Sequence, residues 1–422
     1  MQTIAQETAS QVKWNIENGK FLLNESLRSK ALEVIESTSF PTTKSEAWKY
    51  TRLTKIKNAE LNITGLTHSK IECGLSSDSL KFVFINGHFS IDQSSNSYPE
   101  GLKIEALSQM DPQERIVFGN DLTLENELFN AFNTAYATDG LYIHVSAKMN
   151  IKPVIEIIHI VDGNNVLSNL RNIISTEAFS QINIVQHFIS SENSSGFTNS
   201  VNEISVGKNS KLTIDKLQEE NENQFHIASE IVQQAQDSIF TINTVTLNGG
   251  LVRNNLTINV NGQNCETNLN GAYILKGSQH VDNHTIVDHK VANCLSNELY
   301  KGVINDKATA VFNGKVFVRK DAQKINAFQS NGNVLLSDDA TVNSKPELEI
   351  YADDVKCSHG STTGQLDEEA VFYLRARGIS EKAARQLMVS AFVGDVFEKI
   401  ENESVVERIY KVLEEKFDWV LS

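Results

Sequence analysis

Cysteine is scarce in this sequence and never occurs in closely spaced pairs. The chain has 422 residues and four cysteines, and none of them forms a Cys-x-x-Cys arrangement. This scarcity argues against a disulfide framework and against a complete zinc motif, which needs four ligands. We therefore expect reduced thiols at Cys73, Cys265, Cys294 and Cys357.

Long apolar stretches and an excess of basic residues are missing as well. The first residues, MQTIAQETASQ, lack the basic start and apolar core of a secretory signal, and no run is long enough to span a bilayer. The formal net charge is -15 and the isoelectric point is near 5.2, which disfavours binding to phosphate backbones and anionic lipid. We predict a cytoplasmic protein with no nucleic-acid or membrane partner.

The motifs of common self-contained enzymes are also missing, since the chain has no HExxH, P-loop, GxGxxG or GxSxG. Catalysis on nucleotides or esters by this chain alone is therefore disfavoured. What the chain does contain is a globular composition, 40% hydrophobic and 22% charged. Its length is large for one compact core, so we expect several domains or one elongated core that grows by repetition.

Short strands with polar turns dominate the middle of the chain. In NNLTINVNG, the residues Leu256, Ile258 and Val260 alternate with polar ones, as in an extended segment with one apolar face. Further segments follow at intervals of roughly eleven to fifteen residues, separated by Asn, Gly, Asp or Ser. A sandwich, a barrel and a parallel β-helix all fit this pattern. The length of the series, from about Ile151 to Tyr351, and its Asn-rich turns favour the β-helix.

Helical patterns flank this region on both sides. Up to about Leu53, apolar residues recur at helical spacing among charged ones, which predicts a helical segment that Pro41 interrupts. After Gly364, the segment LDEEAVFYLRARG has acidic residues at its start and Gly378 at its end, and Ser380 is a suitable N-cap for the next helix. A third helix follows. The three helices either fold back on the strands or present a face to a partner.

A thiol and an imidazole stand close together in DDVKCSHGSTTG. In an extended segment Cys357 and His359 point to the same side, and Lys356 and the imidazole are expected to lower the pKa of the thiol. Two ligands do not complete a zinc site, so a metal held here needs ligands from elsewhere, such as another chain. A Cys/His hydrolase would need an oxyanion hole and an orienting carboxylate, for which there is no local motif. A partial metal or sulfur site is thus preferred over a protease, with two ordinary packed side chains as the alternative.

A second group of histidines lies in KGSQHVDNHTIVDHK. It contains His280, His284 and His289 together with Asp282 and Asp288. In an extended segment His280 and His284 share one side, which is compatible with two aligned imidazoles. Histidines beside aspartates at strand turns are more often hydrogen-bonded structural residues than ligands, and we favour this structural interpretation.

The region that contains both groups resembles a known family. The stretch from about Lys276 to Ile379 includes QHVDNHTIVDHKVANCLSNELYKGVI and DDVKCSHGSTTGQLDEEAVFYLRARGI. It is similar to the SufB/SufD family of the SUF iron-sulfur cluster assembly machinery, and the segment DDVKCSHG more closely resembles the SufD branch. Weaker support comes from the upstream motif Trp48-Lys49-Tyr50-Thr51.

This resemblance implies a mainly β fold, in which a right-handed parallel β-helix is flanked by helical N-terminal and C-terminal domains. We accordingly assign residues 1–100 to a mostly helical N-terminal domain and residues 101–363 to the β-helix. Residues 364–422 form the expected C-terminal helical domain, which the resemblance implies to bind SufC, an ABC-type ATPase.

The implied function is that of a non-enzymatic scaffold subunit. Members of the SufD branch pair with the paralogue SufB through their β-helices, and the cluster assembles at the interface between the two. By position, His359 matches the family histidine near that assembly site, and Cys357 matches the neighbouring cysteine. We expect iron or an iron-sulfur cluster to be held there transiently in the complex, with no cofactor bound stably by the isolated chain.

The resemblance also implies the contacts with the ATPase. The segment from Tyr373 to Ile379 begins the helical region concerned, and we expect contacts from Tyr373, Leu374, Arg377, Gly378 and Ile379. The sequence leaves open a homodimer of the isolated chain, the roles of His280 and His284, the entry route of iron and the presence of a flavin in the complex.

Three other functions fit parts of the sequence. A SufB-type paralogue would share the fold, but SufB-like sequences tend to have His-Glu-Ala where this chain has His359, Gly360 and Ser361, and they have additional cysteines. A β-helix enzyme acting on polysaccharide would be exported and would have a groove lined with carboxylates, whereas the acidic residues here are scattered. A stand-alone zinc or thiol-redox protein is the third, and metal analysis of the isolated chain would identify it.

Overall fold

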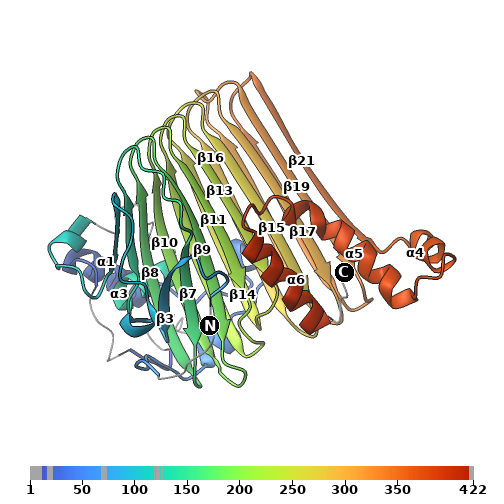
Figure 1. The fold of residues 1–422 in the computed structure, drawn as a ribbon, viewed down its shortest axis with the longest axis horizontal. Coiled ribbons are helices and arrows are strands. Elements are labelled where there is room, and N and C mark those ends of the chain that lie inside the picture. Colours follow the sequence, from blue (N-terminus) through green and yellow to red (C-terminus); the bar gives the residue numbers. More distant parts are fainter. Residues whose placement is uncertain are drawn as a thin grey trace, which may run out of the picture.

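A flattened parallel β-helix forms the body of the molecule (Figure 1). The structure, a computed structural model, describes residues 12–16, 22–67, 74–117, 119, 124 and 127–417. Two long sheets face each other, and from β7 onward the chain alternates between them, so that each pair of strands makes one coil. The predicted parallel β-helix is therefore confirmed, and the sandwich and the barrel are excluded.

The first sheet, called here the even sheet, contains most of the even-numbered strands. In spatial order these are β1 (Trp14–Asn15), β2 (Leu61–Asn62), β8 (Val166–Thr176), β10 (Gly196–Val206), β12 (Gln224–Gln234), β14 (Leu251–Val260), β16 (His280–His289), β18 (Thr309–Val318) and β20 (Thr341–Ile350). At its N-terminal end, β6 (Leu141–Val145) runs parallel to β8, and β5 (Leu102–Ala106) is antiparallel to β6.

The second sheet, called here the odd sheet, faces the first. In spatial order it contains β21 (Val355–Gln365), β19 (Ile325–Leu335), β17 (Leu295–Ile304), β15 (Glu266–Leu275), β13 (Ile239–Thr246), β11 (Lys211–Gln218), β9 (Gln181–Ser190), β7 (Ile155–Val161), β3 (Leu80–Ile85) and β4 (His88–Ser90). All neighbours pair in parallel except β3 and β4, which form an antiparallel hairpin.

Residues at equivalent positions stack in register from coil to coil. Leu251 pairs with His280, His280 with Thr309, and Thr309 with Thr341. The turns between strands place single residues in the left-handed region, with φ of 58° at Asp237 among others. Asn and Asp adopt this conformation more readily than other residues with a side chain, which explains the Asn-rich turns of the sequence.

The interior of the β-helix, called here the lumen, is filled by the side chains that alternate inward along both sheets. Leu256, Ile258 and Val260 of β14 belong to this core together with residues from the other strands. The apolar alternation predicted for this segment is thus confirmed. Several inward positions are polar instead, such as Glu230 and Asn254, and these side chains are buried.

The N-terminal region covers the outer face of the even sheet. The helices α1 (Glu25–Ser37), α2 (Thr54–Asn58) and α3 (Leu128–Tyr136) lie there with a 3-10 turn at Glu46–Trp48. Two more 3-10 turns occur at Ile91–Gln93, beside β3 of the odd sheet, and at Glu114–Val117. Apolar side chains of α1 and α3 pack with Phe197 and its neighbours from the sheet. The helical segment expected up to about Leu53 is shorter than predicted, because α1 ends at Ser37 and the chain then runs irregularly to the 3-10 turn.

Three helices follow the last strand, as predicted, and two of them cover the outer face of the odd sheet. They are α4 (Glu368–Arg375), α5 (Glu381–Phe397) and α6 (Glu403–Phe417). The expected caps are present, because the side chain of Asp367 accepts hydrogen bonds at the start of α4 and that of Ser380 does so at the start of α5. Val393 and Ile409 are fully buried where α5 and α6 pack on the sheet, whereas α4 projects beyond the body (Figure 1).

The three domain boundaries, 1–100, 101–363 and 364–422, stay predictions. Within the described ranges, none of the helices is both long and apolar enough to cross a membrane.

Candidate functional site

The last coil of the β-helix, made of β20 and β21, carries the predicted metal-binding residues, and we call it the terminal coil. Each of its strands is the edge strand of its sheet, with no further neighbour in the part of the chain that the structure describes (Figure 1). The outer backbone groups of an edge strand are free to pair with another strand. The terminal coil is therefore an exposed end that can be extended by a second polypeptide.

Cys357 faces the lumen from β21. It pairs with Ala327, a fully buried core residue of β19, and its own side chain packs against the edge of the main core. Burial raises the pKa of the Cys357 thiol above its ordinary value, and a hydrogen bond with the backbone of Ala327 opposes this only in part. The expected lowering of this pKa is therefore wrong. Lys356 belongs to the opposite face of the strand, and half-burial disfavours the charged thiolate.

His359 shares the face of Cys357 but is exposed. It pairs with Gln329 of β19, whose side chain is buried in the lumen. Its imidazole makes no hydrogen bond or ion pair with any residue that the structure describes. The two side chains are thus brought to one side of the exposed end, as the alternation along a strand requires.

The pair is not part of a complete metal site. No group of three or more His, Cys, Asp or Glu side chains is placed to hold a metal ion anywhere in the described ranges. A stable site for a metal such as zinc needs about four protein ligands. The assignment of His359 and Cys357 as metal ligands consequently stays a prediction that depends on further ligands from outside the chain.

A buried carboxyl lies in the coils directly beneath His359, and sequence reasoning missed it. Gln329 Nε2 donates to Glu298 Oε2 at 2.7 Å, and Thr285 Oγ1 donates to Glu298 Oε1 at 2.5 Å. Burial raises the pKa of Glu298 to about 7, although both hydrogen bonds oppose the shift. The Oε1 atom of Gln329 has no partner among the described residues. A column Glu298, Gln329, His359 therefore places a protonatable group and an open acceptor next to the exposed imidazole.

A groove of about 800 Å³ runs along the outer face of the odd sheet to the terminal coil. Its floor contains Asn297, Phe328 and Ser358, which stack in register on neighbouring strands. Lys399 and Glu401, from the segment between α5 and α6, form part of its wall. At the terminal coil the groove is lined by Ser358, His359 and Gly360, so it reaches the predicted metal-binding histidine, whereas Cys357 is not part of its lining.

The predicted partner-binding residues lie on α4 and the turn after it. Tyr373 is 55% exposed, and the guanidinium of Arg377 stacks over its ring at 4.2 Å from the centroid. Gly378 has φ of 91° and ends the helix, and the amide of Ile379 donates to the carbonyl of Leu374 at 3.3 Å. A left-handed residue at this position is typical of a glycine that terminates a helix. These five residues therefore lie together at the end of α4, where Tyr373, Arg377 and Gly378 are exposed and Leu374 and Ile379 are partly buried.

The second histidine group fastens the N-terminal region to the β-helix. Thr51 Oγ1 lies 2.9 Å from His280 Nε2 and donates to Asp282 Oδ2 at 2.5 Å. Arg253 Nη1 donates to the same carboxylate at 2.7 Å, and its guanidinium stacks over the ring of Trp48 at 3.9 Å. The structural interpretation of His280 fits these contacts, and Trp48 packs against the strands as aromatic side chains commonly do.

Asp282 is the charged centre of this contact. Burial alone would raise its pKa, but the charge of Arg253 and that of His284, whose Nε2 lies 3.0 Å from Asp282 Oδ1, hold the pKa well below its usual range. His289 is hydrogen-bonded within the β-helix, because its Nε2 lies 2.9 Å from the Oγ of Ser296. The three histidines thus have partners within the fold.

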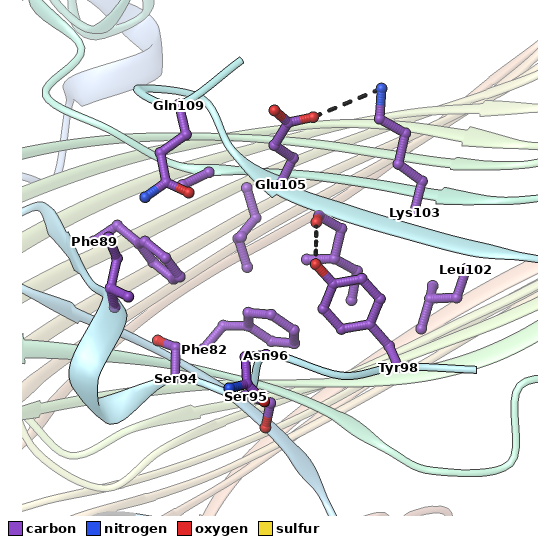
Figure 2. Close-up of a pocket in the computed structure, with 14 residues that line it drawn as sticks. Phe82, Phe89, Ser94, Ser95, Asn96, Tyr98, Leu102, Lys103, Glu105 and Gln109 are labelled. Atoms are coloured by element: carbon purple, nitrogen blue, oxygen red, sulfur yellow. Dashed lines mark hydrogen bonds and ion pairs between the residues drawn. The ribbon is translucent and has the colours of Figure 1, made fainter. Parts of the chain in front are cut away.

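A separate pocket of about 590 Å³ lies at the opposite, N-terminal end of the β-helix, between β3 and β5. Figure 2 shows the rings of Phe82, Phe89 and Tyr98 around it, with Tyr98 donating its hydroxyl hydrogen to the carbonyl of Ile104 at 3.0 Å. Lys103 lies at its rim beside Glu105. This pocket is mostly apolar and is not connected with the terminal coil.

Two family models match the chain in succession. Residues 9–157 match the SufBD protein N-terminal region, and residues 159–392 match the SufBD core domain of SUF system FeS cluster assembly. The second match covers the long β-helix and most of α5.

Curated proteins from bacteria and a plant are similar to the chain over most of its length. An iron-sulfur cluster assembly SufBD family protein of Synechocystis is 31% identical over 401 residues, which are 90% of this chain and 88% of the relative. The iron-sulfur cluster assembly protein SufD of Escherichia coli is 30% identical over 385 residues, 90% of this chain and 89% of the relative. A chloroplastic protein of Arabidopsis thaliana is 31% identical over 399 residues, 90% and 83% of the two chains.

Proposed function

The chain belongs to the SufBD family of iron-sulfur cluster assembly proteins of the SUF system, and from this premise we propose that it is a SufD-type, non-enzymatic scaffold subunit. In this role it pairs with a SufB-type paralogue and with a SufC-type ATPase, and it shapes the place where the cluster is assembled. The similarity to the SufD of Escherichia coli along nearly the whole chain supports the SufD type.

The observation that carries the proposal is the exposed terminal coil. A paralogue with the same coil geometry would extend both sheets by edge-to-edge pairing with β20 and β21, because parallel and antiparallel strand addition satisfies unpaired backbone groups. A second copy of this chain is the competing occupant of the same edge when the paralogue is absent.

The cluster or iron is the cargo of this site rather than a resident cofactor of the chain. His359 and Cys357 would supply an imidazole and a thiol from one side of the interface, and the paralogue would supply the remaining ligands. The raised pKa of Cys357 fits transient use, because a thiol that stays protonated binds metal only when the metal displaces the proton. His359, which is exposed and without a partner in the described chain, is the more accessible ligand.

The ATPase would dock on the exposed end of α4. Tyr373 and Arg377 present a stacked aromatic and cationic surface, and Phe372 beside them is 70% exposed. Tyrosine and arginine are enriched among the residues that dominate binding energy at interfaces. Leu374, Gly378 and Ile379 shape the turn that holds this surface away from the β-helix.

The cytoplasmic location expected from the sequence stays a prediction.

Co-expression with the paralogue and the ATPase tests the complex. We expect the three proteins to co-purify, and recovery of only free chain at micromolar concentration would contradict the proposal. In the isolated complex, His359→Ala is expected to reduce cluster formation under anaerobic reconstitution. Ser358→Ala is the matched control, because Ser358 is on the same strand but on its opposite face. Equal cluster formation by both variants would exclude His359 from the assembly site.

A second pair of variants tests the docking surface. Tyr373→Ala is expected to weaken ATPase binding at least tenfold, as expected for an interface residue that contributes more than about 1.4 kcal/mol. Lys411→Ala on α6 is the control, since Lys411 is exposed and distant in sequence. Cluster loading and ATPase binding are measured separately, so the two parts of the proposal can fail independently.

A further inference from the structure

Two cysteines that the proposed function does not use lie directly above one another in the β-helix. Glu266 pairs with Leu295 in parallel register, and the residue before each of them is a cysteine, Cys265 and Cys294. The amide of Leu295 donates to the carbonyl of Cys265 at 2.9 Å, which continues the ladder to this pair. Both side chains belong to the lumen core and are 1% and 2% exposed.

The two sulfur atoms share their surroundings. The Sγ of Cys265 donates to the carbonyl of Gly262 at 3.1 Å, and the Sγ of Cys294 donates to the same carbonyl at 3.4 Å. In-register strands are spaced about 4.8 Å apart. A disulfide spans Cα atoms about 4.4–6.8 Å apart. The backbone therefore already holds the two residues at a separation that a disulfide can bridge.

The pair replaces a column of serines. In the preceding coils the equivalent positions are Ser180, Ser210 and Ser238, and their register follows from the strands that begin one residue later. Ser180 and Ser210 are hydrogen-bonded to each other at 3.4 Å between their Oγ atoms, and Ser238 lies 3.5 Å from the Sγ of Cys265. Across these five successive coils the corner thus holds a small side chain, a serine in the first three and a cysteine in the last two, whereas the next coil has Ile325 at this position.

The two thiols differ in acidity in the way that a reactive pair requires. The hydrogen bond from Cys294 lowers the pKa of Cys265 to about 6, with help from Ser238 and against the effect of burial. The same hydrogen bond and burial raise the pKa of Cys294. Of the two thiols, Cys265 is therefore the one that loses its proton more readily, and the thiolate is the nucleophilic form.

From the register, the shared carbonyl acceptor and the sulfur contact, we propose that Cys265 and Cys294 are a modification site that forms a reversible disulfide between adjacent coils on exposure to a hydroperoxide. The thiolate of Cys265 attacks the peroxide, breaks its O–O bond and becomes a sulfenic acid, while the leaving oxygen takes up a proton to give water or an alcohol. The thiol of Cys294 then attacks the sulfenic sulfur, and the S–O bond breaks with release of water. One peroxide is reduced by two electrons, and two thiols are oxidised to one disulfide. This inference does not depend on the proposed function.

The disulfide would join the residues that directly precede β15 and β17 in two adjacent coils. Access is through the turn that precedes Cys265, which contains Gly262 and Asn264, the latter with φ of 59°. A small peroxide needs only a local opening of this turn, because the sulfur atoms lie immediately beneath its backbone.

The experiment uses the full chain with Cys73→Ser and Cys357→Ser, which leaves only the pair. After treatment with hydrogen peroxide and unfolding in denaturant, we expect the titratable thiols to fall from two to none and the mass to fall by two hydrogen atoms. A peptide containing Cys265 linked to Cys294 should be recovered and should disappear after treatment with dithiothreitol. Peptide mapping of the oxidised wild-type chain provides the same readout if the double variant does not fold.

Serine variants provide the matched controls, because serine occupies this corner in three other coils. Cys294→Ser should stop at a sulfenic acid on Cys265 that a dimedone probe traps. Cys265→Ser should leave Cys294 as a single thiol that forms no intramolecular disulfide. In the parent chain the rate of disulfide formation should rise with pH through about 6. The proposal is overturned if both thiols survive in the folded chain, or if oxidation proceeds to sulfinic acid without an intramolecular link.

Discussion

Lys216 and Glu230 form an ion pair inside the lumen, and the loss of the lysine charge is predicted to destabilise the fold strongly. Their side chains are 0% and 2% exposed, and Lys216 Nζ lies 2.7 Å from Glu230 Oε1. The lysine also donates to Asn254 Oδ1 at 2.9 Å, and Asn202 Nδ2 donates to the carboxylate at 3.2 Å. Each charge therefore depends on the other and on a few neutral amides.

The expected loss in the free energy of unfolding depends on which charges and hydrogen-bonding groups remain buried in each variant. Lys216→Met keeps most of the volume of the side chain but leaves Glu230 as an uncompensated buried carboxylate, which costs about 3–5 kcal/mol. Lys216→Met combined with Glu230→Gln removes both charges and keeps a hydrogen-bonding group for Asn202. The double variant should recover most of the loss and lie within about 1–2 kcal/mol of the parent chain, so that the coupling energy is at least about 2 kcal/mol.

Urea unfolding, followed by circular dichroism, measures these free energies through the transition midpoints. Lys13→Met is the matched control, since Lys13 pairs with Glu60 at 3.0 Å with both side chains about two-thirds exposed or more. Such a surface pair should contribute less than about 1 kcal/mol. If Lys216→Met costs no more than this control, or if the double variant is as unstable as the sum of the two single ones, the argument from burial is refuted.

Three further changes test other parts of the fold. Burial raises the pKa of Glu298 from 4.5 to about 7, so the folded state binds this proton more tightly than the unfolded state. The stabilisation by the bound proton is complete below pH 4.5 and is lost as the pH rises through 7. The free energy of unfolding from urea titrations should fall by about 3 kcal/mol over this range, and Glu298→Gln should abolish the decrease. Burial opposes ionisation of Glu219, but hydrogen bonds from His187 and Arg408 lower its pKa to about 2. The stabilisation by ionised Glu219 is therefore present above pH 4.5 and is lost as the pH falls toward 2. Arg408→Met should lower the free energy of unfolding by about 2 kcal/mol at neutral pH and accelerate amide exchange in α6. Near pH 2 the variant and the parent chain should not differ in this way. Gly302→Ala would place a methyl group 2.1 Å from a buried tyrosine ring, and we expect a cost of about 1–3 kcal/mol in thermal or urea unfolding, whereas an unchanged midpoint would show that the ring can move aside.

Much of the β-helix could be anticipated from local pattern, but not its choice over other β folds. Leu256, Ile258 and Val260 alternate as in any half-buried strand, and this alternation places them in the lumen. The inward positions of Glu230 and Asn254 are polar, so on alternation alone they resemble solvent-facing residues. Their burial depends on contacts between coils that are far apart in the sequence, and no local pattern contains that information.

The candidate site was predictable to the same extent. Alternation along one strand is enough to bring Cys357 and His359 to one face, and the observed register agrees with it. The direction of the thiol pKa was not predictable, because it depends on how far the core of the preceding coil reaches under Cys357. Glu298 and Gln329 were missed for a related reason: their alignment with His359 is set by the lengths of two intervening turns. The metal role of the pair and the contacts of α4 remain predictions.

The two ends of the β-helix differ in a way that limits how many copies can stack. At the N-terminal end, the antiparallel strands β4 and β5 flank the parallel ladders, and the even sheet ends in the two-residue strand β1. Within the described ranges, the terminal coil is thus the end at which both sheets finish in full-length parallel strands. Growth by stacking must therefore stop after one pairing event, which gives a closed pair instead of a fibre.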